Sequence, residues 1–452
     1  MGEVSGYIEG NAGNYDLIGG SAALNLPLSD SIAVRFAGKL SRRDGYLEDG
    51  YDDEKSQAGR VHLLFDPGKD VSLLLTGFYQ HDGGKGSSFT LMHSDIGDPW
   101  AGPTQQAWRD IVLANTAPPG FLMTGALPRS DGFRDSTVYG VSAELNWDLG
   151  PATLTILPAY RFGKQANRFF VPNYEFVEYE QDKQSSVEVR LAHQGDGLKW
   201  VLGGYFFDER QANQSGKTLR FNQTGFSAAD IPDYGSQTRS YAVFGQMTYS
   251  IADAFRLTGG LRYTYERKTQ NGVNIDYRTP ATLPPNLTCP SGYNLTATPP
   301  LPTTPCALSF NLADRDSYNS ITWKAGFEYD VAPRSLLYGN ASTGFKSGGF
   351  YAAPPPASFN AEKLTAFELG LKNRLLDNKL QLNLEAFYYN YRDHQEAYLG
   401  PTSLPGYFTL ITANAGKAKS YGGMIDIVFQ PTNADRLAVG VQYNKSRYDS
   451  FL

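Results

Sequence analysis

The chain has 452 residues, among them 47 Gly, 29 Tyr and 26 Phe, and carries a net charge of −6 at pH 7. This charge excludes the basic field that nucleic-acid binding requires. The sequence has no uncharged apolar run of about 20 residues, which excludes a protein that crosses a membrane with helices. A single ordinary core does not grow to this length, whereas a barrel grows by adding strands.

Segments with a period of two residues recur along the chain, most clearly at residues 32–41, 321–329, 380–388 and 437–444. Each would form a strand with one apolar and one polar face. Aromatic residues stand near the ends of the apolar faces at Tyr79, Trp147, Tyr249, Tyr329 and Tyr388. Basic residues fall on the polar faces at Arg35, Lys39, Arg190, Arg262 and Lys324. Because a Lys or Arg facing lipid costs about 2–4 kcal/mol at the bilayer midplane, the pattern predicts a transmembrane barrel with a polar lumen.

Short and long connections alternate between these segments. The short ones carry turn residues, at Leu28–Asp30, Asp66–Asp70, Asp148–Pro151, His193–Gly197, Ile251–Asp253, Asp330–Pro333, Leu376–Asn378 and Gln430–Asn433. The long, polar ones are Arg42–Gln57, His81–Ser136, Gly163–Lys183, Glu209–Thr238, Lys268–Asp316 and Phe345–Glu362. Tight turns on one side of a sheet and long loops on the other are typical of outer-membrane barrels, with short periplasmic turns and long extracellular loops.

The strand count and the two ends of the chain suggest an incomplete barrel. Counting from Val4 gives about seventeen strands, whereas single-chain bacterial barrels have even numbers. Met1–Val4 leads into strand-like sequence without a signal peptide, and Leu437–Leu452 stops where it would leave the membrane. We therefore expect an all-β fold in which residues 1–452 form one antiparallel barrel domain, incomplete at both ends.

Short motifs follow one another in a fixed order along nearly the whole chain, at Ser5–Asp16, Arg43–Tyr46, Asp52–Glu54, Gly344–Phe350, Glu362–Lys372, Leu376–Leu380, Ala413–Ala418 and Tyr421–Gly423. In order and spacing they resemble the barrel of TonB-dependent outer-membrane receptors of the iron-complex type. The resemblance implies the outer membrane of a Gram-negative bacterium and a barrel of roughly 22 strands. The N-terminal plug, with its TonB box, and the last strands would then be absent from this sequence.

The same resemblance implies partners. These are TonB, ExbB and ExbD, acting through the plug, and a periplasmic binding protein downstream, with outer-membrane lipid and lipopolysaccharide around the barrel. Catalytic patterns are missing, because the five histidines are scattered and Gly83–Gly86 lacks the spacing of a phosphate loop. Carboxylates at Glu48–Glu54 and Glu175–Asp182 could bind calcium, but solvated loop charge is the simpler interpretation. We expect neither an enzyme nor a resident cofactor or metal.

Aromatic residues are frequent in the predicted loops, at Phe169, Phe170, Tyr174, Phe176, Tyr179, Phe345, Phe350, Tyr351, Tyr398, Tyr407 and Phe408. By the resemblance, such loops and the upper wall capture the ligand, and aromatic surfaces suit flat chelators or sugar rings. Packing between loops is the alternative for any one of them. We expect ligand contacts from Phe345, Lys346 and Phe350. Tyr351, Tyr174 and Tyr398 complete the predicted set.

Cys289 and Cys306 lie in one stretch rich in Pro and Thr. A local disulfide suits an oxidising compartment, and two isolated thiols are the alternative.

The leading hypothesis is energised uptake of a scarce ligand, such as a ferric siderophore. Uptake of cobalamin, haem or an oligosaccharide, a passive porin, and a soluble β-rich carbohydrate-active enzyme are the alternatives.

Overall fold

The computed structural model describes residues 3–68, 70–87, 100, 131–171, 174–220, 226–278, 306–351, 357–401 and 408–450. Within these ranges every regular element is a β-strand. No helix in the described ranges is long and apolar enough to cross a membrane.

The strands follow one another along the chain with these bounds: β1 Ser5–Gly13, β2 Leu17–Ser29, β3 Ile32–Arg43, β4 Glu54–Phe65, β5 Val71–Gly84, β6 Phe133–Asp148, β7 Thr153–Val171, β8 Tyr174–Gln194, β9 Leu198–Arg220, β10 Phe226–Ala252, β11 Phe255–Arg278, β12 Cys306–Ala332, β13 Ser335–Lys346, β14 Gly349–Tyr351, β15 Ala357–Phe359, β16 Glu362–Leu375, β17 Leu380–Arg392, β18 Gln395–Pro401, β19 Phe408–Asn414, β20 Lys417–Phe429 and β21 Leu437–Ser450. They form one 17-stranded sheet and two 2-stranded sheets, β14–β15 and β18–β19.

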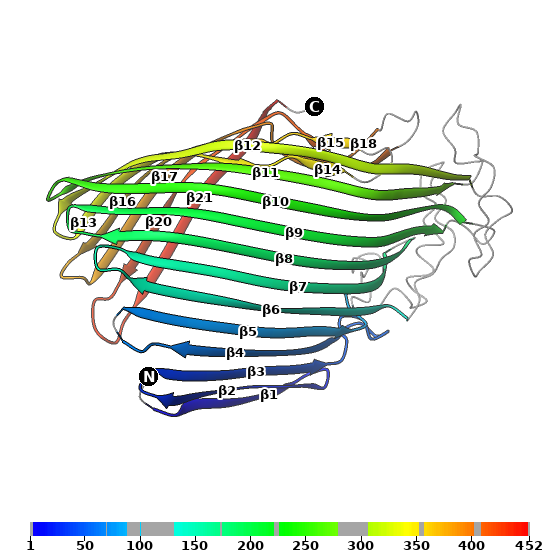
Figure 1. Ribbon diagram of the computed structural model, residues 1–452, viewed down its shortest axis with the longest axis horizontal. Coiled ribbons are helices and arrows are strands. Elements are labelled where there is room, and N and C mark those ends of the chain that lie inside the picture. Colours follow the sequence, from blue (N-terminus) through cyan, green and yellow to red (C-terminus); the bar gives the residue numbers. More distant parts are fainter. Residues whose placement is uncertain are drawn as a thin grey trace.

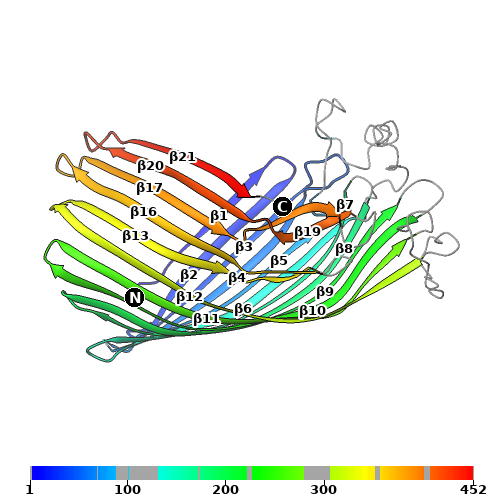
Figure 2. The ribbon, with the colours of Figure 1, turned by 90° about the horizontal axis from the view of Figure 1, so that it is seen from above.

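All pairings in the large sheet are antiparallel, and each strand pairs with its neighbours in chain order once the two small hairpins are set aside. The sheet is strongly twisted and curls round, with β1 and β21 as its edge strands in the described chain (Figures 1 and 2). The predicted all-β antiparallel fold and the count of about seventeen strands are confirmed.

The register assigns the two faces of the sheet without ambiguity. Residues directly opposite each other in an antiparallel pair share a face. Val187 lies opposite Phe206, Phe206 opposite Tyr241, and Tyr241 opposite Tyr265. This face, which we call the outer face, carries the exposed apolar residues, among them Val243 at 62% exposure. The opposite, polar face is the inner face.

The outer face has an apolar band between two aromatic rows. Trp147, Trp200, Tyr249 and Tyr329 belong to the row near the tight turns, and Tyr79, Tyr139, Tyr241, Tyr388 and Tyr443 to the row near the loops. On β10, Tyr241 and Tyr249 lie about 27 Å apart along the strand, at about 3.4 Å per residue. A tilt of about 40° reduces this to about 21 Å across the bilayer, close to the height of a lipid-facing band.

Basic residues ring the outer face beyond the loop-side aromatic row, and we call this ring the basic collar. Its members are Arg42, Lys55, Lys164, Arg168, Lys183, Arg210, Arg239, Arg267, Arg315, Lys363, Arg392, Lys417, Lys419, Lys445 and Arg447. The described carboxylates on the same outer surface of the strands are Asp135, Asp208, Asp233 and Asp449.

Tight turns gather at one end of the strands, on the left of Figure 1. There β2 and β3, β10 and β11, and β12 and β13 are separated by only two residues each. The longer connections leave from the other end, as the sequence predicts. Between β16 and β17, Leu376, Asp377 and Asn378 all have positive φ, a conformation that Asn and Asp adopt more readily than most residues.

Three of the predicted loops are wrong in extent. Most of Gly163–Lys183 and of Glu209–Thr238 is strand, and so are both ends of Lys268–Asp316, because β7 to β12 continue far beyond the membrane. A membrane crossing needs about 9–11 residues, whereas β10 and β12 have 27 residues each. Outside lipid neither face of a strand has to be apolar, so the alternation that reveals a strand in the sequence becomes short and irregular there.

Candidate functional site

The inner face of β8–β12, beyond the level of the loop-side aromatic row, is the candidate functional surface, and we call it the acidic wall. Its ionisable members are Glu178, Glu180, Asp182, Glu209, Glu266, Asp314 and Asp316, with Lys268 as the basic one among its described side chains. They share a face because side chains two residues apart on a strand point the same way. Such a surface favours ligand groups that donate hydrogen bonds or carry positive charge.

Glu180 is the most strongly perturbed carboxyl of the acidic wall. It lies between Glu178 and Asp182 along β8, and the side-chain amide of Asn213 donates to it at 3.4 Å. Burial raises the pKa of Glu180 to about 7, helped by a hydrogen bond and the negative charge of Asp182 and by the charge of Glu178. The Asn213 hydrogen bond opposes this rise. The wall therefore changes charge near neutral pH.

We expect Glu180 to make the extended part of β8 less stable as pH rises from 5 to 8. Its pKa in the folded protein is raised above the ordinary value of 4.5. The stability that it contributes is therefore fully present below that value and is lost as pH rises through about 7. Hydrogen exchange of β8 amides at pH 5 and pH 8 should differ more in the wild type than in Glu180→Gln. An identical pH response in both proteins would contradict the raised pKa of Glu180.

A second polar group stands at the loop-side rim, near the end of β16 where Glu362 lies. His394 Nδ1 lies 2.8 Å from Glu362 Oε2, and His394 Nε2 lies 3.0 Å from Glu396 Oε1. The hydroxyl of Tyr448 donates to Glu396 at 2.5 Å. This hydrogen bond lowers the pKa of Glu396, and the nearby His394 and Lys346 act in the same direction. We call Glu362, His394, Glu396 and Tyr448 the rim latch.

The rim latch fixes the hairpin β18–β19 to the rim of the sheet. Gln395, the first residue of β18, donates its backbone N–H to Glu362 at 2.8 Å. Its buried side-chain amide donates to the carbonyls of Ser347 and Asn360, at 2.9 Å each. Because Ser347 precedes β14 and Asn360 follows β15, one glutamine joins both small hairpins, which also contact each other through β15 and β19.

The hairpin β14–β15 reaches the acidic wall through Ser347 and Gly348. The Ser347 hydroxyl donates to Glu266 of β11. A Cβ at Gly348 would lie 2.7 Å from the Tyr318 hydroxyl and 2.2 Å from the carbonyl oxygen of Phe359, so only glycine fits this approach. Figure 1 shows β14, β15 and β18 towards the loop end of the strands. The candidate site is therefore an acidic wall flanked by two anchored hairpins.

The structure distributes the predicted ligand contacts over different places. Lys346 is on the inner face, opposite Glu362, whereas Phe345 is on the outer face, opposite Lys363. Phe350 and Tyr351 are half-buried in β14, and Tyr398 is half-buried in β18.

The other predicted aromatics divide between strands and undescribed parts of the chain. Tyr174 begins β8, but its side chain lies outside the described part, as do those of Phe170, Phe176 and Phe408 and the whole of Tyr407. Phe169 and Tyr179 belong to strands rather than loops, with Phe169 on the inner and Tyr179 on the outer face.

The two carboxylate clusters have different surroundings. In the first, the side chain of Asp53 is buried, accepts the backbone N–H groups of Lys85 and Gly86, and lies 3.6 Å from the ammonium of Lys55. These bonds join the connection between β3 and β4 to the connection between β5 and β6. The second cluster is largely strand and forms part of the acidic wall. Among the described residues, no group of His, Cys, Asp and Glu has the arrangement of a metal site.

The predicted disulfide is not visible in the described structure. Cys289 lies outside the described residues, and Cys306 is described only as the first residue of β12, without its side chain.

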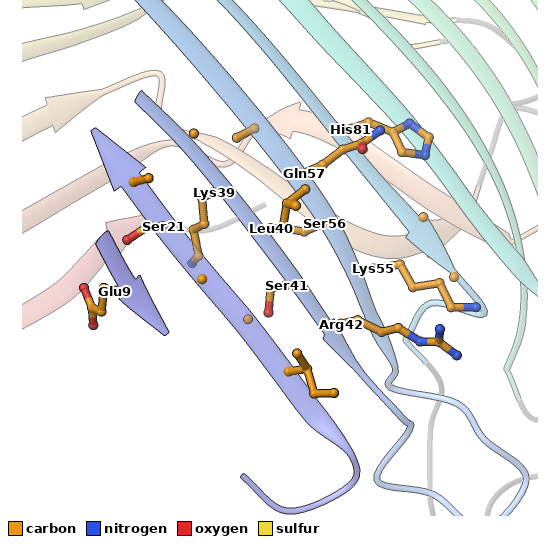
Figure 3. Close-up of a pocket in the computed structure, with 18 of the residues that line it drawn as sticks. Glu9, Ser21, Lys39, Leu40, Ser41, Arg42, Lys55, Ser56, Gln57 and His81 are labelled. Carbon is orange, nitrogen blue, oxygen red and sulfur yellow. The ribbon is translucent and has the colours of Figure 1, made fainter. Parts of the chain in front are cut away.

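A cavity of about 1210 Å³ lies along β1–β6, away from the acidic wall. Figure 3 shows its lining, which combines outer-face residues such as Leu40 and Arg42 with inner-face residues such as Lys39 and Ser41. The glycines of this region, among them Gly20 and Gly38, leave the backbone accessible. None of the predicted ligand contacts lines this cavity.

Sequence reasoning missed the acidic wall as a surface, although it noted part of its carboxylates. The signal was present as Glu178, Glu180 and Asp182, spaced two residues apart. The sequence predicts a loop here because the alternation is short: Val177 and Tyr179 alternate with these carboxylates, but polar Gln181 and Lys183 follow on the same face.

Solved structures with the same fold include receptors for iron complexes or siderophores. The ferric yersiniabactin uptake receptor FyuA from Yersinia pestis superposes with a TM-score of 0.75 at 15% identity, covering 100% of this chain and 62% of that one. The open form of the ferric-catecholate import receptor Fiu from E. coli K12 gives 0.66 at 16% identity, with 99% and 66% covered. The siderophore receptor PiuA from Acinetobacter baumannii gives 0.67 at 15% identity, with 99% and 64% covered.

The chain thus spans less than two thirds of the length of these receptors. At such identities the superpositions establish the fold, and the family comes from the sequence. Residues 165–450 match the model of the family described as TonB dependent receptor-like, beta-barrel. The apolar band, the aromatic rows and the turn–loop asymmetry agree with that match. The chain therefore belongs to the TonB-dependent receptor-like β-barrel family and is a β-barrel protein of the Gram-negative outer membrane.

Proposed function

We propose that this barrel serves the TonB-dependent uptake of a scarce ligand, namely a ferric siderophore or a similar iron chelate. The observation that carries the proposal is the family match over residues 165–450, a region that includes the strands of the acidic wall. The siderophore receptors with the same fold support the ligand class. TonB, ExbB and ExbD are the proposed partners, and they would supply the energy from the inner membrane.

The charge of the acidic wall favours one kind of chelate. Carboxylates dominate the described inner face of β8–β12, so an anionic ligand would be repelled there. A neutral or cationic chelate rich in hydroxyl and amine donors would be attracted, and Lys346 and the two small hairpins would contact it from the flank of the wall. We therefore propose a ligand of low negative charge.

The test is growth under iron limitation, with ferric chelates of different net charge as the sole iron source. Deletion of the receptor gene should abolish growth on a neutral or cationic chelate, and inactivation of TonB should have the same effect. Uptake that continues without TonB would identify a passive channel instead. If growth depends on the receptor only when cobalamin, haem or an oligosaccharide is supplied, that compound and not an iron chelate is the ligand.

A pair of variants connects the test to the acidic wall. Glu178→Gln with Glu209→Gln should weaken uptake of cationic chelates several-fold, because two inner-face carboxylates lose their charge. Asp233→Asn removes a carboxylate from the outer face of the neighbouring β10 and should leave uptake unchanged. Equal effects of the two changes would show that ligand uptake does not depend on the charge of the acidic wall.

A further inference from the structure

Two motifs of the sequence, Arg43–Tyr46 and Asp52–Glu54, lie outside the acidic wall and meet at the connection between β3 and β4. The glycine of the first motif packs against the backbone of Tyr51, because a Cβ at this position would clash with the Tyr51 carbonyl oxygen. The arginine of the first motif donates a hydrogen bond to the carbonyl oxygen of Asp52 at 2.7 Å. The two motifs therefore fold the connection back on itself.

This folded connection presents aromatic rings to the outside. The guanidinium carbon of Arg43 lies 3.5 Å from the centroid of the Tyr46 ring. Tyr15, in the turn between β1 and β2, meets Tyr46 edge to face, with ring centroids 4.9 Å apart. The backbone N–H of Asp44 donates to the carbonyl of Tyr15 at 2.7 Å, which holds the two connections together. Tyr15 and Tyr46 nevertheless remain 40% and 44% exposed, so both rings are accessible to a ligand.

The two tyrosines and Trp100 line a pocket of about 610 Å³, which we call the side pocket. Trp100 is 51% exposed, and its carbonyl accepts the backbone N–H of Glu48 at 3.1 Å, which fixes it beside the connection between β3 and β4. The volume lies in the range of about 300–1,000 Å³ that small-molecule sites occupy. None of the predicted ligand contacts and none of the carboxylates of the acidic wall lines the side pocket.

The lining places the side pocket on the outer side of the sheet. Arg42 and Lys55 face each other on the outer face, extend side by side (Figure 3) and belong to the lining. Their chain neighbours Arg43 and Glu54 face each other on the inner face and do not belong to it. Arg42 stands two outer-face positions beyond the level of Tyr79 in the aromatic row, or about 14 Å along the strand. The side pocket is therefore separate from the lumen and lies beyond the hydrocarbon of the membrane.

The polar groups of the side pocket carry both signs of charge. Asp44 and Glu48 supply carboxylates, and Arg42, Lys55 and Lys85 supply cations. The ammonium of Lys85 is held at the pocket by a hydrogen bond to the carbonyl of Asp49, at 2.5 Å. Such a mixture favours neither an anion nor a cation. It suits hydroxyl groups, which donate to carboxylates and accept from ammonium and guanidinium groups.

We propose that the side pocket binds a neutral saccharide outside the cell. The apolar face of a sugar ring would stack on the exposed rings of Trp100, Tyr46 and Tyr15, and its hydroxyls would bond to the charged groups around them. The bound saccharide stays on the outer side of the sheet, so this activity is a second one beside the proposed uptake. A soluble glycan and the saccharide of the cell's own surface glycolipid share this chemistry.

The test is calorimetric titration of the purified protein in a polyoxyethylene detergent, whose headgroup contains no sugar. The probes are neutral hexasaccharides of glucose, galactose, mannose and N-acetylglucosamine, and the delipidated saccharide of the surface glycolipid. The wild type should bind at least one of them, and the preferred probe identifies the source. Trp100→Ala should weaken that binding about tenfold, the effect of losing one stacking surface. Trp100→Phe keeps a ring and should retain most of the affinity.

The matched control is Trp147→Ala, which removes a tryptophan of similar exposure, 46%, from the aromatic row near the tight turns. It should leave saccharide binding unchanged. If Trp100→Ala does not fold, saturation-transfer NMR of the wild type decides, since the protons on one face of the sugar ring should receive the most saturation from the aromatic rings. No binding of any probe, binding of the flat anion salicylate in place of saccharides, or an equal loss in Trp147→Ala would overturn the proposal.

Uptake of the iron chelate separates this proposal from the proposed function. Trp100→Ala should take up the chelate as the wild type does, because the side pocket lies outside the lumen. Glu178→Gln with Glu209→Gln changes the acidic wall and should leave saccharide binding unchanged. A parallel loss of uptake and saccharide binding in Trp100→Ala would assign the pocket to the transport path and overturn the second activity.

Discussion

Met247→Arg is expected to lower the free energy of unfolding of the barrel in a lipid bilayer by about 1–2 kcal/mol, between the cost at the bilayer midplane and the smaller cost at an interface. Met247 is on the outer face of β10, between Tyr241 and Tyr249, and is 52% exposed to the space that lipid fills. An arginine at this depth leaves its guanidinium in hydrocarbon, one outer-face position (about 7 Å along the strand) from Tyr249 of the turn-side aromatic row. Urea unfolding of the protein in vesicles measures the change.

Gln246→Arg is the control for Met247→Arg. Gln246 is the preceding residue on the same strand and is also exposed, but it points to the inner face. The same arginine there enters a polar lumen and should change the free energy of unfolding by less than about 0.5 kcal/mol, as a surface substitution does. Similar losses in both variants would mean that the face assignment of β10 is wrong.

Glu362→Ala is expected to release the hairpin β18–β19 from the rim. The substitution removes the acceptor for the backbone N–H of Gln395 and the contact to His394 Nδ1, both at 2.8 Å. Gln395 is buried, so its N–H would lose a partner without gaining water, at a cost of about 1–3 kcal/mol. Hydrogen exchange of the β18 and β19 amides should accelerate about 10- to 100-fold, since about 1.4 kcal/mol is a factor of ten.

Glu362→Gln separates the charge of the rim latch from its hydrogen bonds. The amide oxygen can still accept from the Gln395 N–H, so exchange in β18–β19 should accelerate less than in the alanine variant. Amides in the centre of β10, far from the latch, should exchange at the same rate in all three proteins. Faster exchange throughout the sheet would instead indicate a general loss of stability.

The predicted barrel rests on features that short stretches of sequence contain. A lipid-facing strand must alternate apolar and polar residues, so Ile321 to Tyr329 and Leu380 to Tyr388 reveal both their strand structure and their outer face. Tight turns carry their own chemistry, as Leu376–Asn378 does with its left-handed backbone. For the same reason, Arg35 and Lys39 could be placed on the inner face.

The alternation of apolar and polar residues does not reveal the parts of β7 to β12 that extend beyond the membrane. Beyond the bilayer neither face has to be apolar, and strands there are held by backbone pairing with neighbours that are distant in sequence. Glu178 to Asp182 therefore appeared as loop charge. Their grouping with Glu209, Glu266 and Asp316 depends on the register across β8 to β12.

The sequence by itself determined the barrel, its polar lumen and its turn–loop asymmetry, because the membrane imposes a local rule on every strand that crosses it. Tertiary structure alone decided which side chains meet beyond the membrane. Lys346 and Phe345 are neighbours in sequence but lie on opposite faces, and Glu362 meets His394 only because the start of β16 lies beside the start of β18. The register of strands far apart in the chain fixes both the acidic wall and the basic collar, and no short stretch of sequence contains that register.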